Sequence, residues 1–334
     1  MGFLEDDLRA TAQAVGFSGV VRIDRRGVPG IVQAFGLADR AYGIANTADT
    51  QFGTASATKG LTALTAMALV EQGRLDLATT ARSLLDEDLP EIADDVTVEH
   101  LLAHRSGIGD YFDEDVFDDI TQYAMPVPVH QLSTPGEYLA VLAGHPMAFP
   151  AGERFAYNNG GYVVLSLLVE RAGGATYHEL VRRHVLEPAG MADTAFLRSD
   201  ELPARAARGY LALGGLRTNV LHLPVVGVGD AGAYSTVADL HRLWQALYSG
   251  RIVSPDFLAL MVTPRSDWPE ESRRYGLGFH LHASGEAAWL EGYDAGVSVV
   301  SLHEPRQDLT YTVISNWTDG AWPIVNLLNQ QLGL

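Results

Sequence analysis

Residues 52–59, which read Phe-Gly-Thr-Ala-Ser-Ala-Thr-Lys, hold two side chains whose types and spacing could do chemistry. Ser56 and Lys59 are three positions apart, so on a helix they share one face within hydrogen-bonding reach. The long run 60–70 carries no charge, and a helix that is apolar all round is normally buried. Burial disfavours the ammonium form of lysine. The stretch therefore predicts a serine nucleophile whose proton is taken by a lysine amine.

A helix-capping serine and a surface lysine would give the same spacing, so Ser-x-x-Lys alone is a weak pattern. Lys59, however, is the only lysine among the 23 lysine and arginine residues of the chain. Arginine keeps its proton in proteins, whereas lysine can lose it. Retention of lysine at this one position therefore favours proton transfer. A serine at a helix start also meets free backbone N–H groups, which favour developing negative charge.

Composition narrows the function classes. With 334 residues and 47% apolar residues, the chain can bury a sizeable core. A net charge of −18 argues against binding to nucleic acids or anionic membranes. No cysteine is present, which excludes disulfides, and no metal-ligand spacing or phosphate-binding loop predicts a metal or a cofactor. The N-terminus has no signal-peptide pattern and no stretch has membrane-spanning length, so we expect a cytoplasmic protein.

Strand-like alternation occurs near both ends of the chain, and helical patterns fill the middle. The predicted strands are 17–23, 30–37, 275–282, 286–290, 297–303 and 309–315. Terminal helices are predicted at 3–15 and 322–332. This order indicates a single α/β unit of the α+β type over residues 1–334, with an antiparallel sheet of about five strands flanked by the terminal helices.

The sheet part would comprise residues 1–59 and 271–334, and residues 60–270 would form a large, mostly helical insertion. Within it, residues 108–152 are rich in proline, glycine and aspartate. A connection of that length is usually a lid or a binding loop, so we expect one here.

A second notable stretch, Tyr-Asn-Asn at 157–159, precedes an apolar helix at 163–171. Together with the Ser-x-x-Lys stretch at 52–59, this stretch resembles the serine β-lactamase-like superfamily. Within the superfamily, the resemblance is to the branch of class C β-lactamases, D-aminopeptidases, DD-peptidases and class VIII carboxylesterases. The match covers most of the chain. Its further motifs are His-Arg-Ser-Gly at 104–107, Pro-Ala-Gly-Met at 188–191 with Asp193-Thr194, and Gly-Ala-Tyr-Ser-Thr at 232–236 with Asp239-Leu240. The resemblance implies a β-lactamase/transpeptidase-like fold.

By position, the resemblance makes Ser56 the acylated nucleophile. Lys59 and Tyr157 would be the pair that activates it and then shuttles its proton. Asn159 would hydrogen-bond both the substrate and Lys59. No cofactor is needed for this chemistry. The alternative for Tyr157 is an aromatic residue that only packs at a helix start.

This chain differs from the superfamily pattern at the third motif, which is Lys-Thr-Gly or His-x-Gly. The best register places Leu290-Glu291-Gly292 there. Gly292 would let substrate approach the strand closely. The resemblance makes the backbone N–H groups of Ser56 and Tyr293 the oxyanion hole. Leu290 has no charge, whereas the superfamily has a lysine or a histidine at this position. In an alternative, shifted register, Tyr293 would take the place of that residue. A lid arginine, 105 or 154, could supply the missing cation.

Three functions fit these observations. The first is an esterase or amidase that acts on small, uncharged substrates through an acylated Ser56. The second is a D-Ala-type peptidase, a penicillin-binding protein or a weak β-lactamase. The third is a non-catalytic penicillin-recognition module, against which the single lysine argues. The expected partner is a small ester or amide, and the sequence leaves the acyl acceptor and the oligomeric state open.

Overall fold

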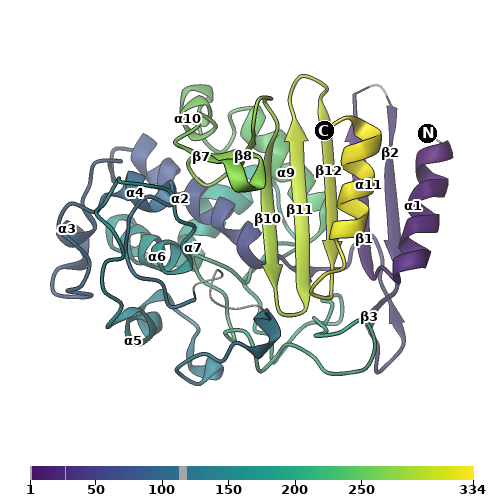
Figure 1. The fold of residues 1–334 in the computed structure, drawn as a ribbon, viewed down its shortest axis with the longest axis horizontal. Coiled ribbons are helices and arrows are strands. Elements are labelled where there is room, and N and C mark those ends of the chain that lie inside the picture. The colour runs from purple at the N-terminus through teal and green to yellow at the C-terminus, as the bar shows by residue number, and fades with distance from the viewer. Residues whose placement is uncertain (1, 27, 113–118) are drawn as a thin grey trace.

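The computed structural model describes residues 2–26, 28–112 and 119–334. Across these ranges, eight strands form one antiparallel sheet in the order β2-β1-β12-β11-β10-β9-β8-β7 (Figure 1). These strands are β1 (Gly19–Arg25), β2 (Val28–Phe35), β7 (Ser266–Trp268), β8 (Arg273–Tyr275), β9 (His280–His282), β10 (Ala288–Asp294), β11 (Val297–Glu304) and β12 (Leu309–Ser315). Outside this sheet, β3 (Leu37–Asp39) pairs with β4 (Ile44–Ala45), and β5 (Phe52–Gly53) pairs with β6 (Tyr234–Ser235).

The predicted α+β class is confirmed, but the sheet extends beyond the five expected strands. The strands at this end of the sheet, β7, β8 and β9, have three residues each, which is too few to show alternation in the sequence. The segment predicted as one strand, 275–282, is divided between β8 and β9. Between them Gly278 has a φ of +91°, a conformation that turns the chain and that glycine adopts most readily.

Strand β1 joins the two ends of the chain. It pairs with β2 on one side and with β12 on the other, where Gly19 lies opposite Ser315. The first and last parts of the sequence therefore form one sheet, as the strand-like patterns at both ends predict.

Helices cover both faces of the sheet. The α-helices are α1 (Gly2–Val15), α2 (Thr58–Glu71), α3 (Ala81–Leu85), α4 (Val98–Leu102), α5 (Leu139–Leu142), α6 (Asn159–Gly173), α7 (Tyr177–Val181), α8 (Glu187–Ala189), α9 (Val237–Tyr248), α10 (Pro255–Met261) and α11 (Trp322–Leu332). Short 3₁₀ turns are η1 (Ala55–Ala57), η2 (Ile120–Gln122), η3 (Val129–Gln131), η4 (Pro135–Tyr138) and η6 (Pro269–Glu271), and η5 (Arg182–Leu186) is a π-helical turn.

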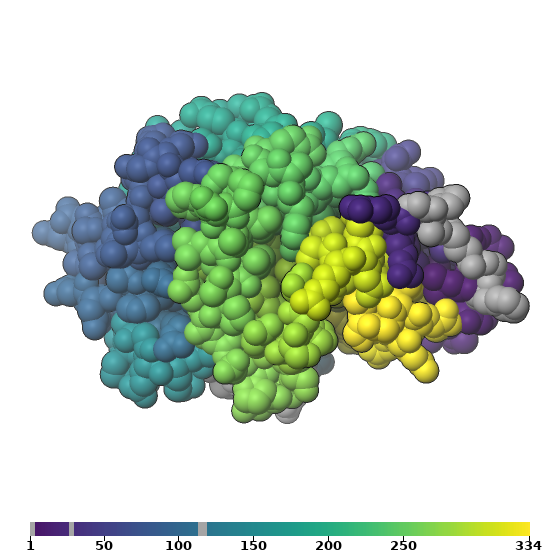
Figure 2. Space-filling view, turned by 90° about the horizontal axis from the view of Figure 1, so that it is seen from above, coloured from purple at the N-terminus to yellow at the C-terminus, as the bar shows by residue number. Residues whose placement is uncertain are grey.

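The terminal helices α1 and α11 lie side by side over one face of the sheet (Figure 1). Figure 2 shows the same neighbours from above, with the yellow C-terminal residues beside the purple N-terminal ones. Leu8 of α1 and Ile324 and Leu328 of α11 form a core with this sheet face. The opposite face contacts α9, and a larger core there includes α2 and α6. Helix α2 is buried at every position from 58 to 69, as its uncharged sequence predicts.

Residues 108–152, the expected lid, contain η2, η3, η4 and α5 in their described part. Residues 113–118 of this segment lie outside the described residues. In the part of the chain that the structure describes, no helix combines the length and apolar composition needed to span a bilayer.

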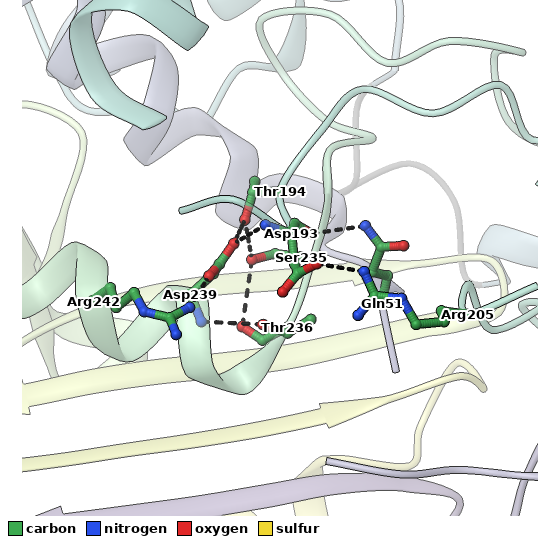
Figure 3. A network of polar contacts seen from close by, with 8 residues as sticks. All are labelled: Gln51, Asp193, Thr194, Arg205, Ser235, Thr236, Asp239 and Arg242. Atoms are coloured by element: carbon green, nitrogen blue, oxygen red, sulfur yellow. Dashed lines mark hydrogen bonds and ion pairs between the residues drawn. The ribbon is translucent and has the colours of Figure 1, made fainter. Parts of the chain in front are cut away.

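The Asp193-Thr194 motif and the motif at 232–236 with Asp239 contact each other in a buried polar network (Figure 3). The fully buried carboxylate of Asp239 accepts hydrogen bonds from the Asp193 backbone N–H and the Thr194 hydroxyl, both at 2.8 Å, and pairs with Arg242. Gln51, next to β5, donates its side-chain N–H to the Asp193 carbonyl at 2.8 Å. The network therefore fixes the segment that leads into residue 56.

We expect Asp239→Asn to destabilise the protein by about 3 kcal/mol, because an amide oxygen cannot replace the carboxylate toward all of its donors and the ion pair is lost. Urea unfolding measures this. Asp200→Asn is the matched control, since Asp200 pairs with Arg198 on the surface, where both side chains are 44% exposed, and such pairs contribute less than about 1 kcal/mol. Equal effects of the two substitutions would contradict a structural role for the network.

Candidate active site

Ser56 lies in the middle of the 3₁₀ turn η1, directly before α2. Ala55 precedes it with a φ of +42°, a left-handed conformation that costs energy for any residue with a side chain. Such strain persists where the surrounding structure enforces it and is concentrated at functional sites. The backbone thus turns sharply at Ala55 and places Ser56 at the start of the buried helix.

The Lys59 amine is buried, with the residue 2% exposed, and it contacts three oxygen atoms. Its Nζ lies 2.9 Å from Ser56 Oγ, 2.8 Å from Asn159 Oδ1 and 3.0 Å from the Asp230 carbonyl oxygen. The amine donates a hydrogen bond to each of these oxygens, and an ammonium group has the three hydrogens that these contacts need. The predicted contacts of Lys59 with Ser56 and Asn159 are thus present.

Tyr157 reaches the same point from the segment before α6. Its ring centroid lies 4.8 Å from Lys59 Nζ. On its other side it contacts the buried His104 ring, with centroids 4.3 Å apart. The structure therefore brings together Ser56, Lys59, Tyr157 and Asn159, four residues that sequence reasoning took from segments about a hundred positions apart.

His104 supports Tyr157 rather than acting as a base. Its Nδ1 accepts the Asn158 backbone N–H at 3.1 Å. Complete burial lowers the pKa of His104 well below its usual value, and the nearby Lys59 lowers it further. The imidazole is therefore neutral and fills the space behind the tyrosine ring. This accounts for the histidine of the His-Arg-Ser-Gly motif in the sequence.

Asp110 fixes Asn159 at the start of α6. Its carboxylate accepts the backbone N–H groups of Asn159 and Gly160 at 2.6 and 2.8 Å. Burial raises the pKa of Asp110 to about 7, against the opposing effect of these hydrogen bonds and of Lys59. The Asn158 side chain adds an N-cap bond of 2.6 Å to Gly161. Asn159 is held from both its backbone and its side chain.

Asp230 is a site residue that sequence reasoning missed. Its backbone carbonyl accepts a hydrogen bond from Lys59, and its carboxylate accepts one from the Tyr111 hydroxyl. Burial raises the pKa of Asp230, whereas Lys59 and Tyr111 lower it. The only local signal is its place in the turn-like run Gly-Asp-Ala-Gly at 229–232. A backbone carbonyl leaves no signature in residue type.

Gly292 of β10 lies against the turn that carries Ser56. A Cβ atom at this position would come within 2.3 Å of the Thr54 carbonyl oxygen and 3.0 Å of the Ala57 backbone nitrogen. The close approach of strand and turn therefore requires glycine, in agreement with the register that places this residue in the third motif.

Leu290 lies in the core, not at the cavity wall. It is 2% exposed and packs against Gly60, one residue beyond Lys59. Glu291 lies on the opposite face of β10, as alternation along a strand requires. From there Glu291 lines a cavity together with Ser56 and Tyr157. Tyr293 is 37% exposed and lines the same cavity.

Two cavities meet at Ser56 and Tyr293. The first, called the aromatic cavity below, is lined mainly by apolar and aromatic side chains that include Tyr111, Phe112, Tyr123, Met125 and Tyr138 of the expected lid segment. The second, called the charged cavity, is lined by Ser56, Tyr157, Trp268, Glu271, Arg273, His280, Glu291, Gly292 and Tyr293. The lid segment thus contributes a wall of the site, as its position in the sequence suggests.

Neither of the lid arginines considered above faces these cavities. Arg105 donates to the backbone carbonyls of Arg265 and Gly152. Arg154 lies over the Phe149 ring, 4.1 Å from its centroid. The guanidinium that lines the charged cavity belongs instead to Arg273 of β8. Within the described residues, no group of histidine and acidic side chains has the arrangement of a metal site.

The chain matches the Beta-lactamase family over residues 4–329. The chain belongs to the beta-lactamase family. A penicillin-binding protein from Bacillus halodurans has a closely similar structure, with a TM-score of 0.91 and 34% identity over 97% of this chain and 99% of that one. This assignment confirms the resemblance and the fold that the motifs predict.

Curated relatives in the beta-lactamase family match with lower coverage. The putative penicillin-binding protein PbpX of Bacillus subtilis is 27% identical over 278 residues, which are 80% of this chain and 63% of that protein. Esterase EstB of Burkholderia gladioli is 35% identical over 185 residues, 53% of this chain and 46% of that protein. The chain thus spans less than two thirds of the length of either relative.

We expect Gly292→Ala to lower stability by about 1–3 kcal/mol, because the added methyl group overlaps the Thr54 carbonyl and forces η1 away from β10. Thermal unfolding measures this, and a crystal structure of the variant should show the displaced turn. Gly214→Ala is the control, since a Cβ there meets no atom within 4 Å. A Gly292→Ala variant as stable as this control, with an unmoved turn, would refute the close approach.

Proposed function

We propose that this protein is a serine hydrolase that cleaves small esters or amides through an acyl-enzyme on Ser56. The observation that carries the proposal is the buried Lys59 amine, whose Nζ lies 2.9 Å from Ser56 Oγ. Two carbonyl oxygens, from Asn159 and Asp230, hold the amine in place. This is the arrangement of a nucleophile and its base within hydrogen-bond reach, with the base oriented by further groups.

In the proposed reaction, Ser56 Oγ attacks the carbonyl carbon of the substrate while its proton passes to the Lys59/Tyr157 pair. The backbone N–H groups of Ser56 and Tyr293 would stabilise the oxyanion of the tetrahedral intermediate. When the bond to the leaving group breaks, the pair returns the proton to the departing oxygen or nitrogen. Water then attacks the acyl carbon and gives one proton to the pair, the bond between the acyl carbon and Ser56 Oγ breaks, and the pair passes that proton to Ser56 Oγ. Every proton in this cycle is carried by side chains that the site contains.

The same geometry supports an esterase or amidase in preference to a peptidase or β-lactamase. Substrates of the latter carry a carboxylate, which family members meet with a cation or a polar ring from the third motif. Here Leu290 occupies that position and is directed into the core, while Glu291 lines the cavity. A carboxylate beside Glu291 would be repelled. We therefore propose that Asn159 and the backbone around Gly292 and Tyr293 bind the reacting ester or amide group.

A fluorophosphonate probe should form one covalent adduct with this protein, because the proposed nucleophile is a single activated serine. Intact-protein mass spectrometry measures the adduct. It should disappear in Ser56→Ala and persist in a control variant, Ser284→Ala, which lies in an exposed turn. Labelling that survives the Ser56 substitution would refute the assignment, and the absence of any adduct on the wild-type protein would favour a non-catalytic module.

Lys59→Arg should reduce kcat for p-nitrophenyl butyrate by about 10²–10⁴-fold, the usual contribution of a general base. The substitution keeps the charge but removes the ability to accept a proton. Steady-state kinetics give the loss, and circular dichroism checks the fold. Since the longer guanidinium disturbs a buried site, Lys59→Met serves as a second variant that removes charge and base together. If either variant turned over substrate at the wild-type rate, Lys59 could not be the base.

A further inference from the structure

The two cavities differ in what they offer a substrate. The aromatic cavity is walled mainly by lid residues such as Tyr111, Tyr123 and Tyr138, although Asp230 and Asp294 also line it. The Asp230 carboxylate is buried and bound by the Tyr111 hydroxyl. The charged cavity is walled by Glu271, Arg273 and Glu291, and the Glu291 side chain is 27% exposed. Both cavities are lined by Ser56, so a substrate whose carbonyl carbon lies at Ser56 extends one part into each. One cavity would receive the acyl group and the other the leaving group.

The position of Tyr157 decides between these assignments, and this step rests on the proposed function. In the proposed mechanism the Lys59/Tyr157 pair protonates the leaving group. Among the described residues, Tyr157 lines the charged cavity and is not part of the wall of the aromatic cavity. The leaving group therefore extends into the charged cavity, and the acyl group enters the aromatic one.

The charged cavity carries a net negative charge. Two carboxylates, Glu271 and Glu291, line it with one guanidinium, Arg273. Both terminal nitrogens of Arg273 are already engaged, Nη1 with Glu291 at 3.0 Å and Nη2 with Glu271 at 2.9 Å. Burial lowers the pKa of His280 well below its usual value, and Arg273 lowers it further, so this imidazole adds no positive charge.

Glu291 keeps one oxygen available for a ligand. Trp289 Nε1 and Arg273 Nη1 both donate to Oε2, at 3.1 and 3.0 Å. Among the described residues, none donates a hydrogen bond to Oε1 of Glu291. The side chain is 27% exposed, so a substrate group in the cavity can reach it. The protein excludes part of the water around this carboxylate, so its interaction with a nearby charge is screened less than it would be in bulk water.

Aromatic rings complete the wall around these carboxylates. The Tyr157, Trp268 and His280 rings lie nearly parallel, with Trp268 6.3 Å from Tyr157 and 6.1 Å from His280 between centroids. Arg273 already lies over the Trp268 ring, 4.5 Å from its centroid. Aromatic faces and carboxylates together attract alkylammonium groups. They offer a carboxylate no favourable contact.

We propose that the charged cavity is a leaving-group subsite for a positively charged ammonium group, with Glu291 as the residue that determines this specificity. The substrates would be esters of amino alcohols or amides of diamines whose acyl part is apolar. Hydrolysis breaks the bond between the acyl carbon and the leaving oxygen or nitrogen, and the leaving group departs with the proton from the Lys59/Tyr157 pair. The net charge of −18 also attracts cationic substrates over longer distances.

Three butyrate esters of similar size test the proposal: butyrylcholine, its neutral isostere 3,3-dimethylbutyl butyrate, and the butyrate ester of glycolate. Initial rates in a pH-stat give kcat/KM for each. A charge-assisted contact contributes about 1.5–3 kcal/mol, or roughly 10- to 100-fold in rate. We expect kcat/KM to be about tenfold or more higher for the cationic ester than for the neutral one, and lowest for the anionic ester.

Glu291→Gln should lower the cationic-to-neutral ratio of kcat/KM by about tenfold and raise the relative rate for the anionic ester, because Arg273 then loses a carboxylate partner. Glu271→Gln, at a side chain that is 50% exposed, should change the ratio in the same direction and keeps the test valid if the first variant does not fold. Glu286→Gln is the control, since Glu286 pairs with Arg306 on the surface and should leave the ratio unchanged.

Equal rates for the cationic and neutral esters, or a ratio that Glu291→Gln and Glu271→Gln leave unchanged, would overturn the subsite assignment. The proposed function would still stand in that case if hydrolysis of the neutral ester disappears in Ser56→Ala. If the wild-type protein hydrolysed none of the three esters, both the subsite and the proposed function would fail.

Discussion

The structure depends on one buried amine. Lys59 lies within the hydrophobic core, and an isolated ammonium group there would cost several kcal/mol in lost hydration. Three oxygen acceptors, from Ser56, Asn159 and Asp230, offset that cost, and each is delivered by a different segment of the chain. The η1 turn, the start of α6 and the loop before β6 must therefore converge within about 3 Å of Nζ, a hydrogen-bond distance. The buried amine therefore constrains three segments of the chain in addition to the apolar packing around them.

The sheet supplies the second constraint. Strand β10 meets η1 at Gly292, and the absence of a side chain there lets two backbone segments come into contact. The Asp239 network also holds the segment before η1, through Gln51 and the β5–β6 pairing (Figure 3). The turn that carries Ser56 is therefore supported by strand β10 and by a buried polar network. This support explains how the left-handed conformation of Ala55 can persist, since backbone strain is kept only where the surroundings enforce it.

Much of this arrangement could be predicted from the sequence, for identifiable physical reasons. The pairing of Ser56 with Lys59 follows from helical spacing, and the long uncharged run predicts the buried α2. Alternating residues predict β1, β11 and β12, which have seven or eight residues each. The three-residue strands β7 to β9 were not separable, because so short a segment shows no period. Asp230 acts on Lys59 through its carbonyl oxygen, which all residue types share, and the inward direction of Leu290 depends on the space left by Gly60 in the facing helix α2.

Leucine at position 290, where the proposed register places the third motif, has a consequence for the whole cavity. A lysine or histidine there would bring positive charge beside Lys59 and Tyr157. With Leu290 in the core, the guanidinium that lines the cavity is that of Arg273, which comes from β8 and is bound by two carboxylates. The two carboxylates balance the charge of this guanidinium, so it leaves no net positive charge for a carboxylate ligand. The region beside Ser56 therefore has the opposite polarity to one built around a free cation, while Ser56 and Lys59 stay in hydrogen-bond contact. Because function depends on the site and not on the fold, residues on a neighbouring strand are expected to alter which substrates approach the proposed nucleophile.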